Sequence, residues 1–284
     1  VQTCALPISS KTFLFGFVAA PDKLKGFTAG ANYYRIQQSG IPFASAQYVV
    51  NQWYANGGAT NPNNPFSASA GPSAANPLGS QVELTPTFDL YQVRNVGAIN
   101  TGNRTTDGVD LQLGQEVNTD VGTFGLNGNA TRILTYEQEN FPGSGAIGYL
   151  GKYWAPGAAL EDSGFPEWRA NLTFSYRYDR YSFAFAWNYT DGYRENINGG
   201  ISSADFDPKN PDNADALADV PSYQTFDLRL TYKIHKVEAD FTFGINNLFD
   251  AAPPMVQSTF GDGYDRRLTD IRGRQWFVQL SRQF

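Results

Sequence analysis

The chain has 284 residues, of which 15% are aromatic and only 17% charged, with a net charge of −6 at pH 7. This acidic balance gives no electrostatic footprint for nucleic acid, so no nucleic-acid partner is expected. No run approaches the roughly 20 apolar residues of a membrane-spanning helix, which excludes that class. The 28 glycines and 16 prolines disfavour long helices, so the chain is rich in aromatic residues without being hydrophobic or strongly helical.

The first residues need separate treatment. The chain begins at Val1 and its only methionine is Met255, so we expect the natural N-terminus to lie further upstream. Residues 1–8 resemble the translation of a sequencing adapter, and we interpret them as an assembly artefact, with a native octet as the alternative. They contain Cys4, the only cysteine, so disulfides, thiolate metal sites and cysteine catalysis are not expected.

Strands are predicted wherever apolar and polar side chains alternate along the chain. In the first half the pattern is loose, with strands expected over 12–19, 27–36 and 123–136, and one through Val109, Leu111 and Leu113.

The second half alternates strictly. Residues 171–178 and 181–190 predict a hairpin, and 225–234 and 237–246 predict another, joined by the two residues His235 and Lys236. With a final strand over 273–284, about nine strands are expected. The polar sides carry charges in mid-strand, at Asp227, Arg229, Glu238 and Asp240, which suit a wet interior better than a dry core.

The connections alternate between short and long. Short ones are expected at 21–25, 118–122, 179–180 and 235–236, and long ones at 37–85, 138–165, 195–221 and 251–272. In an antiparallel sheet this alternation places every tight turn at one end and every long loop at the other, as in outer-membrane barrels. The predicted fold class is therefore all-β, a transmembrane antiparallel β-barrel.

Several motifs resemble one known family. They include NNLFD at 246–250, Pro253-Pro254, Tyr264-Asp265, RGR at 272–274 and a last strand ending in Phe284. Shorter pieces agree, namely YYRI at 33–36, GVD at 108–110 and PEWRAN at 166–171. Together they resemble the C-terminal end of TonB-dependent outer-membrane receptors.

That resemblance implies that residues 9–284 form the C-terminal part of a plugged barrel of about 22 strands. It implies active uptake of a siderophore, vitamin or oligosaccharide across the outer membrane of a Gram-negative bacterium. The implied partners are TonB, through a missing N-terminal segment, the outer-membrane assembly machinery, the lipid bilayer and a small ligand. No catalytic residue, cofactor or metal is expected. The alternative is a binding or porin-like barrel without energised transport.

The last strand also resembles the signal that the assembly machinery reads, through Trp276, Val278, Leu280 and Phe284. Arg282 interrupts its apolar side, and we expect this side chain to snorkel at the periplasmic edge of the membrane.

Other motifs favour ordinary interpretations. GSGAIG at 143–148 matches a dinucleotide fingerprint, but no helical pattern follows, so a loop is expected. Asp205 and Asp207 have the spacing of the first two ligands of a calcium-binding loop. The later ligand and turn positions of such a loop are occupied by unsuitable residues, Lys209, Asn210 and Ala216. A solvated acidic loop is expected there, with a weak cation site involving Asp212 or Asp215 as the alternative. His235, the only histidine, lies in a turn, where catalysis is not expected.

The first long loop contains a helical pattern. Ala46, Val49, Val50 and Trp53 share one face and precede Gly57-Gly58, so a short amphipathic helix is predicted there. We expect it to pack against its own loop rather than to contact ligand.

Ligand binding is expected in the long loops, because the tight turns are too short to form a pocket. The candidate residues are Tyr149, Tyr153, Trp154, Tyr193 and Arg194. The rings of the four aromatic residues suit stacking on a sugar or a metal chelate. Membrane-surface aromatics are the alternative interpretation. The loop 138–165 contains one basic residue, Lys152, and three acids, Glu139, Glu161 and Asp162. This charge balance favours a neutral, carbohydrate-like ligand over an anionic siderophore.

Overall fold

The computed structural model describes residues 8–43, 46–55, 82–84, 90–93, 99–154, 163–196, 217–257 and 262–282. The chain divides into two compact units. One consists of Val1–Ser10, Gln37–Arg104 and Gln138–Ala146, and the other of Lys11–Ile36, Thr105–Glu137 and Ile147–Phe284. We call them the loop unit and the sheet unit.

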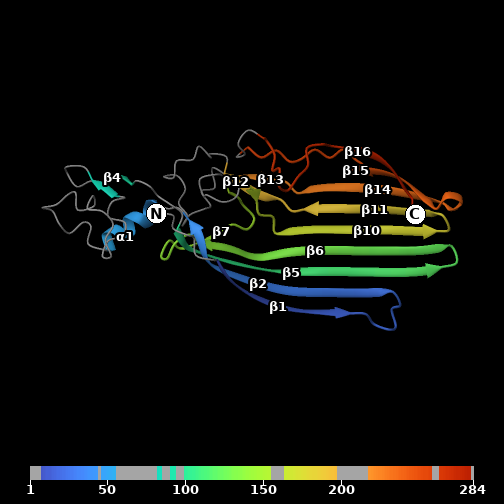
Figure 1. The fold of residues 1–284 in the computed structure, drawn as a ribbon, viewed down its shortest axis with the longest axis horizontal. Coiled ribbons are helices and arrows are strands. Elements are labelled where there is room, and N and C mark those ends of the chain that lie inside the picture. Colours follow the sequence, from blue (N-terminus) through green and yellow to red (C-terminus); the bar gives the residue numbers. More distant parts are fainter. Residues whose placement is uncertain are drawn as a thin grey trace. The chain divides into compact units, whose positions relative to one another are not determined.

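The main sheet is antiparallel wherever its strand register is resolved, and its strands follow chain order (Figure 1). Among the described residues, nine strands form the main path of this sheet, as expected, and β7 is its tenth strand. The strands are β1 (Ser9–Ala19), β2 (Phe27–Phe43), β5 (Ile99–Thr119), β6 (Gly122–Glu139), β10 (Trp168–Tyr178), β11 (Tyr181–Thr190), β14 (Tyr223–Ile234), β15 (Ala239–Asn246) and β16 (Gln275–Arg282), with β7 (Ala146–Gly148) beside β6.

The alternation of short and long connections is also confirmed. Tight turns at 20–26, 120–121, 179–180 and 235–238 lie at one end of the strands, on the right in Figure 1. The connections from β11 to β14 and from β15 to β16 are long and lie at the opposite end, which we call the loop end.

One turn and one strand end differ from the prediction. The connection after β14 has four residues, because His235–Val237 form a 3-10 turn (η4) and Glu238 is left-handed at φ 48°. Ile234 pairs with Ala239, so Val237 is outside the strand. The connection is two residues longer than predicted. Because side chains alternate with period two, this even number leaves each residue of β15 on its predicted face. β2 continues to Phe43 through 37–40, where no apolar alternation marks a strand.

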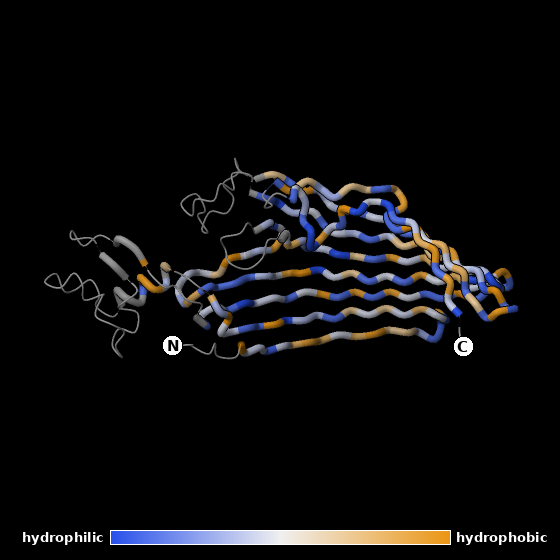
Figure 2. The backbone as a smooth tube through the Cα atoms, turned by 45° about the horizontal axis from the view of Figure 1, so that its top comes forward, coloured by the Kyte–Doolittle hydropathy of each residue, from blue (hydrophilic) through white to orange (hydrophobic). Residues whose placement is uncertain are grey.

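The register matches apolar with apolar side chains across five strands. Phe174, Phe185, Leu228, Ile245 and Trp276 are successive cross-strand partners. We call this side the apolar face, and the side of their sequence neighbours the polar face. Figure 2 shows the resulting alternation of hydropathy along each strand. The two faces follow from period-two alternation held in register by pairing.

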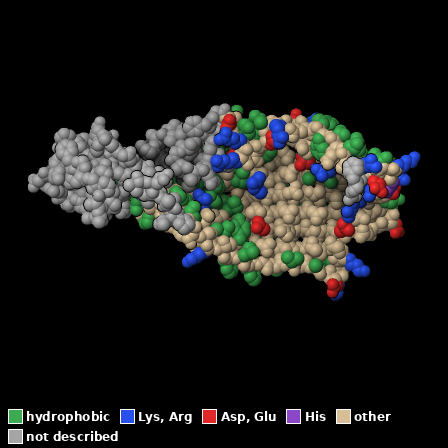
Figure 3. Space-filling model, in the orientation of Figure 1, with side chains coloured by type: hydrophobic (Ala, Val, Ile, Leu, Met, Phe, Trp, Pro, Cys, Tyr) green, Lys and Arg blue, Asp and Glu red, His purple; other side chains and the backbone are tan. Residues whose placement is uncertain are grey.

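In the adjacent row on the polar face, three of the five residues are small and two are large. Its cross-strand partners are Ser175, Ala184, Arg229, Gly244 and Phe277. In the view of Figure 3, backbone and side chains that are neither charged nor hydrophobic occupy most of the middle of the sheet, and charged side chains lie both at the turn end and toward the loop end.

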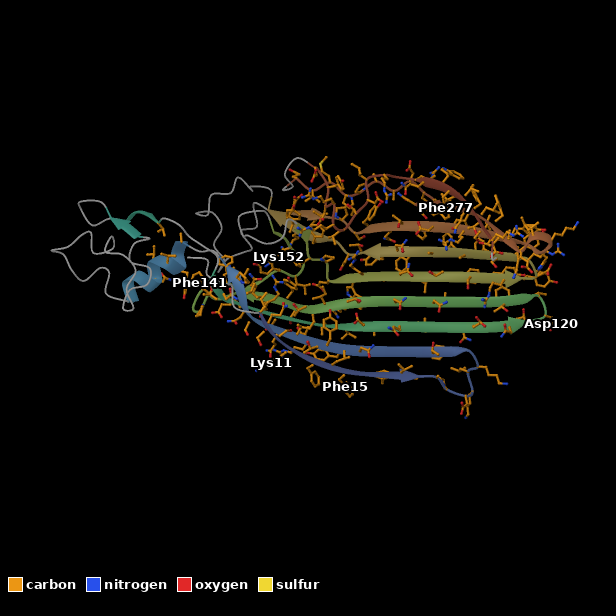
Figure 4. The ribbon with its side chains drawn as sticks, viewed as in Figure 1. Lys11, Phe15, Asp120, Phe141, Lys152 and Phe277 are labelled. Atoms are coloured by element: carbon orange, nitrogen blue, oxygen red, sulfur yellow. The ribbon has the colours of Figure 1, made fainter. Side chains whose placement is uncertain are left out.

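Phe277, labelled in Figure 4, is the aromatic residue of this row. Its ring covers Gly244, where an added Cβ would overlap the ring atoms. The Arg229 guanidinium carbon lies 5.8 Å from the centroid of the same ring. An aromatic ring that covers a strand glycine replaces the side-chain packing that the glycine lacks.

Tyrosine and tryptophan residues on the apolar face lie near both strand ends, whereas phenylalanines such as Phe174 and Phe185 lie in mid-strand. At the turn end, the Tyr181 and Tyr232 rings lie 5.2 Å apart, and the Tyr176 hydroxyl donates to the Val121 carbonyl at 2.5 Å. At the loop end, Trp187 Nε1 donates to Gln224 Oε1 at 3.0 Å. Such a distribution is typical of interfacial girdles.

The loop unit contains the predicted helix, α1 (Ala46–Ala55), and a hairpin of β3 (Val82–Leu84) and β4 (Leu90–Val93). Val49 and Val50 are buried, as the helical pattern predicts, and the Tyr48 ring lies 5.5 Å from Phe141. The Trp53 side chain is outside the described part. No helix among the described residues is long and apolar enough to cross a bilayer.

Candidate ligand-binding loops and polar face

A hydrogen-bonded chain of side chains crosses the polar face. Asn171 Nδ2 donates to Asn188 Oδ1 at 2.7 Å, and Asn188 Nδ2 donates to Asp227 Oδ2 at 2.8 Å. The second oxygen, Asp227 Oδ1, accepts the backbone N–H of Asn247 at 2.8 Å. Donors therefore satisfy both oxygens of this mid-strand carboxylate, which lets a charge remain in the sheet without an ion pair.

Beside this network lies a recess of about 460 Å³ between the polar face and the segment that returns to β16. Charges of both signs and amides line it, so it suits a polar, hydrogen-bonding molecule better than an apolar one. The lining residues with these groups include Arg169, Asn188, Asp227, Asn247, Asp270 and Arg272.

Loops from separate parts of the sheet unit meet in one small hydrophobic core. Tyr153 belongs to β8 (Tyr153–Trp154), which pairs with β9 (Ser163–Gly164). Tyr193 and Val220 belong to β12 (Tyr193–Asn196) and β13 (Leu217–Val220), which pair with each other. Val256 comes from the last loop, and all four residues are buried together. The two tyrosine rings stack with centroids 6.2 Å apart and planes 20° apart. We call these four residues the loop core.

Asp265 joins the same loops by hydrogen bonds, although it is only 2% exposed. Its Oδ2 accepts the N–H of Gly164 at 2.6 Å and the Tyr193 hydroxyl at 3.3 Å, and its Oδ1 accepts the N–H of Arg267 at 2.9 Å. Burial and the adjacent carboxylate raise the pKa of Tyr193, so its hydroxyl remains a donor.

A second buried acid acts in the same way. Glu195 is 2% exposed, and its Oε1 accepts the N–H of Gln257 at 3.1 Å. Sequence reasoning missed Glu195, and it quoted Asp265 only as part of a family motif. The available signal was the position of each acid within two residues of a tyrosine in the long loops, Tyr193 for Glu195 and Tyr264 for Asp265.

The structure separates the five predicted ligand residues. Tyr153 and Tyr193 meet in the loop core, whereas the Tyr149 ring lies 5.7 Å from Tyr136 and 5.5 Å from Phe165. Arg194 is exposed, and its backbone N–H donates to the Gly151 carbonyl. The Trp154 side chain lies outside the described part, as do Glu161, Asp162, Asp205, Asp207, Lys209, Asn210, Asp212, Asp215 and Ala216.

The three tyrosines are 5–8% exposed, so neighbouring groups of the protein cover each ring. Their observed contacts hold the loops together, and direct contact with a ligand remains a prediction.

The NNLFD segment turns the chain from β15 into the last loop. Asn247 and Asp250 have φ values of 53° and 58°, in the left-handed region that asparagine and aspartate tolerate. The Asn247 side chain both donates to the Ala251 carbonyl and accepts its N–H, each at 2.9 Å. Asp250 Oδ1 accepts the N–H of Arg274 at 2.7 Å, which ties the two ends of the loop together.

The remaining motifs take simple local structures. Gly143 and Gly145 have positive φ, and the short strand β7 follows them instead of a helix. His235 begins the turn η4. Within the described ranges, no group of three His, Cys, Asp or Glu residues is placed to hold a metal ion.

On β16, Trp276, Val278 and Leu280 are exposed on the apolar face. Arg282 lies at the turn end, opposite Ala239. Phe284 is outside the described residues, and the assembly role of this strand remains a prediction.

Residues 5–248 match the family model described as TonB dependent receptor-like, beta-barrel. No curated protein sequence matches the chain. Among solved structures, a mutant of the ferric enterobactin receptor PfeA from Pseudomonas aeruginosa has a TM-score of 0.53 at 12% identity, over 96% of this chain and 31% of that one. The iron transporter FrpB from Neisseria meningitidis has a TM-score of 0.52 at 11% identity, over 98% and 31%. P. aeruginosa FpvA, bound to a heterologous pyoverdine, has 0.51 at 12%, over 97% and 27%.

The chain thus spans less than a third of the length of these three structures, and at such identities the likeness concerns the fold alone. The family match covers most of the sequence, and the paired faces and alternating connections agree with it. The chain therefore belongs to the TonB-dependent receptor β-barrel family, whose barrels lie in the outer membrane of Gram-negative bacteria.

Proposed function

We propose that residues 9–284 form the C-terminal part of a receptor barrel that takes up a scarce nutrient across the outer membrane with energy delivered through TonB. The remaining strands, the plug domain and the TonB-contact segment would lie upstream. The main support is a polar strand face with a fully hydrogen-bonded Asn–Asp network, beneath long loops, in a sheet of this family. Such a face keeps an aqueous path beside an apolar, lipid-facing surface.

In this proposal the ligand first binds at the loop end. The loop core and Asp265 order the loops, and the exposed Arg194 lies beside them with its backbone bonded to Gly151. Tyr149, Tyr153, Trp154 and Tyr193 supply the aromatic groups of the site. No covalent step is required, because binding and release move the nutrient.

The ligand class is a proposal of its own. PfeA is described as a ferric enterobactin receptor, and FpvA was solved with a bound pyoverdine. At 12% identity, this similarity of fold does not identify the ligand of the present chain. The loop sequence that contains Lys152 holds more acids than bases, which makes a neutral carbohydrate-like ligand our first candidate and an anionic siderophore the second. A vitamin is the third class to test.

The decisive experiment uses the full-length receptor in cells with and without functional TonB. Uptake of the cognate nutrient is expected only when TonB is functional, because the plug must be displaced by an energised partner. Equal uptake in both strains would instead establish the non-energised, porin-like alternative.

The loop site has its own test. Replacing Tyr153 and Trp154 together by Ala should weaken ligand binding about tenfold, because aromatic packing contributes roughly 1 kcal/mol or more. Tyr178→Ala, at an exposed ring of the turn end, is the matched control and should not change binding. Unchanged binding in the double variant, with normal barrel yield, would assign these rings to structure alone.

A further inference from the structure

The recess of about 460 Å³ on the polar face has more bases than acids among its lining residues, although the whole chain has a net charge of −6. It lies between the sheet and residues 267–274, which we call the strap. Its charged lining consists of three arginines and two aspartates, namely Arg169, Arg267, Arg272, Asp227 and Asp270. The local charge is therefore opposite to that of the chain.

Both acids of the recess are already engaged. Asp227 accepts hydrogen bonds from the Asn188 side chain and the Asn247 backbone, each at 2.8 Å. Asp270 Oδ2 accepts from Arg272 Nε at 2.9 Å, so the charges of these two residues are paired with each other. A ligand in the recess would meet carboxylates whose oxygens already have donors.

The other two arginines are available. Arg169 lies on the polar face of β10 opposite Thr190, and Arg267 is the first residue of the strap. Both side chains are exposed, and neither guanidinium forms an ion pair with another residue in the part of the chain that the structure describes. Two guanidinium groups thus line one recess with their donors open to a ligand.

The backbone that carries these two arginines is fixed. The Arg267 N–H donates to Oδ1 of the buried Asp265 at 2.9 Å, and the Arg274 N–H donates to Oδ1 of Asp250 at 2.7 Å, so both ends of the strap are tied. Arg169 belongs to a strand that is paired on both sides. Because the backbone is ordered before binding, less conformational entropy is lost when a ligand is held.

The rest of the recess offers neutral hydrogen-bonding groups. Hydroxyls and amides line it, from Thr190, Tyr223, Thr225, Asn246, Thr269 and Gln275. Such groups both donate and accept, as the hydroxyls of a sugar do. A guanidinium, in contrast, matches the two oxygens of a carboxylate with a planar fork of donors.

We propose that this recess binds a carboxylated sugar, such as a uronate unit of an oligosaccharide. Arg169 and Arg267 hold its carboxylate, and the neutral groups of the recess bind its hydroxyls. This inference rests on the proposed function and specifies the nutrient as an acidic carbohydrate. The acids in loop 138–165 favour a neutral ligand, but other elements line the recess, and its unpaired charges are positive.

The test measures binding to the full-length receptor, purified in detergent, by isothermal titration calorimetry. The probes are trigalacturonate and its fully methyl-esterified form, which have the same rings and differ in charge. The wild type should bind the acid about tenfold or more tightly than the ester, because charge-assisted hydrogen bonds are stronger than neutral ones. Arg169→Gln and Arg267→Gln should each lower the affinity for the acid about tenfold and leave the affinity for the ester unchanged.

Two further variants serve as controls. Arg266→Gln removes the neighbouring guanidinium, which lies 3.6 Å from Asp262 and does not line the recess, so the affinity for the acid should not change. Arg169→Lys combined with Arg267→Lys keeps the charge without the planar fork and should retain the preference for the acid at reduced affinity. Equal affinity of the wild type for acid and ester, no binding of the acid, or equal loss in Arg266→Gln would overturn the proposal.

This experiment is separate from the test of transport. Binding in detergent requires no TonB, so a receptor that transports without TonB would still prefer the acid. TonB-dependent uptake of another nutrient, together with no preference for the acid, would leave the proposed function intact and reject the recess as a carboxylate site.

Discussion

The regular strands and the loop core of the sheet unit are held together in different ways. In the strands each apolar residue meets its counterpart on the next strand, as Phe185 meets Leu228, so the faces extend by repetition. The loop core has four buried side chains, and the carboxylates of Asp265 and Glu195 join the same loops, which are far apart in the chain. A repeated pattern distributes stability over many pairs, whereas the loop core depends on a few long-range contacts.

The largest expected effect tests the strands. Phe185→Arg should cost about 2–4 kcal/mol of folding free energy in lipid, because it places a charge near the bilayer midplane. Thr173→Arg, on the polar face, should cost little. Equilibrium folding of the full-length receptor into vesicles measures both, and equal sensitivity would contradict the lipid-facing assignment.

The loop core should respond to Asp265→Ala. This change removes the acceptor for the Gly164 N–H and the Tyr193 hydroxyl, and each unsatisfied buried donor costs about 1–3 kcal/mol. We expect protease cleavage within the long loops while the folded barrel persists. Asp262→Ala, on the same loop and exposed, is the control and should leave cleavage unchanged. Cooperative loss of the barrel itself would show that loops and strands are not independent.

A third variant tests packing inside the strands. Gly244→Ala should destabilise the sheet by about 1–3 kcal/mol, because the new methyl group overlaps the Phe277 ring. Adding Phe277→Ala should recover part of that loss, as unfolding free energies of the four variants in a double-mutant cycle would show. If the two effects simply add, the ring does not pack on Gly244.

The smallest expected effect is a pH response of the last loop. Hydrogen bonds from the Arg272 side chain and backbone lower the pKa of Asp270 from 3.8 to about 2. The contribution of this pair to loop stability is therefore complete above pH 3.8 and declines as pH falls through about 2. Pepsin cleavage of wild type and Asp270→Asn should converge as pH falls over this range. Because the pair is exposed, a small difference is expected, and identical profiles at pH 4 would contradict it.

The strands were predictable because their information is local. Alternation over ten residues identified both faces of β10 and β11, and the length of the intervening segments identified the turn end. The same reasoning missed the inward position of Phe277, since nothing in its own strand marks Gly244 as the space for its ring. It also made the connection at His235 two residues too short, an error that period-two alternation hides.

The candidate site was less predictable. Sequence reasoning found aromatic residues in the long loops, but it did not separate Tyr149 from Tyr153 and Tyr193, nor assign Asp265 and Glu195 as buried acceptors. Loop geometry depends on contacts between residues such as Gly164 and Asp265, which are 101 positions apart, and no local pattern encodes them.

The sequence by itself determined the β-barrel class, the two faces of the later strands and the family, because side-chain period, loop length and short motifs are properties of neighbouring residues. Only the tertiary structure decided which loop residues are buried and how Asp227 and Asp265 are satisfied. These features arise when distant strands and loops come together, since a buried hydrogen bond or a shared face exists only after the chain has brought both partners into place.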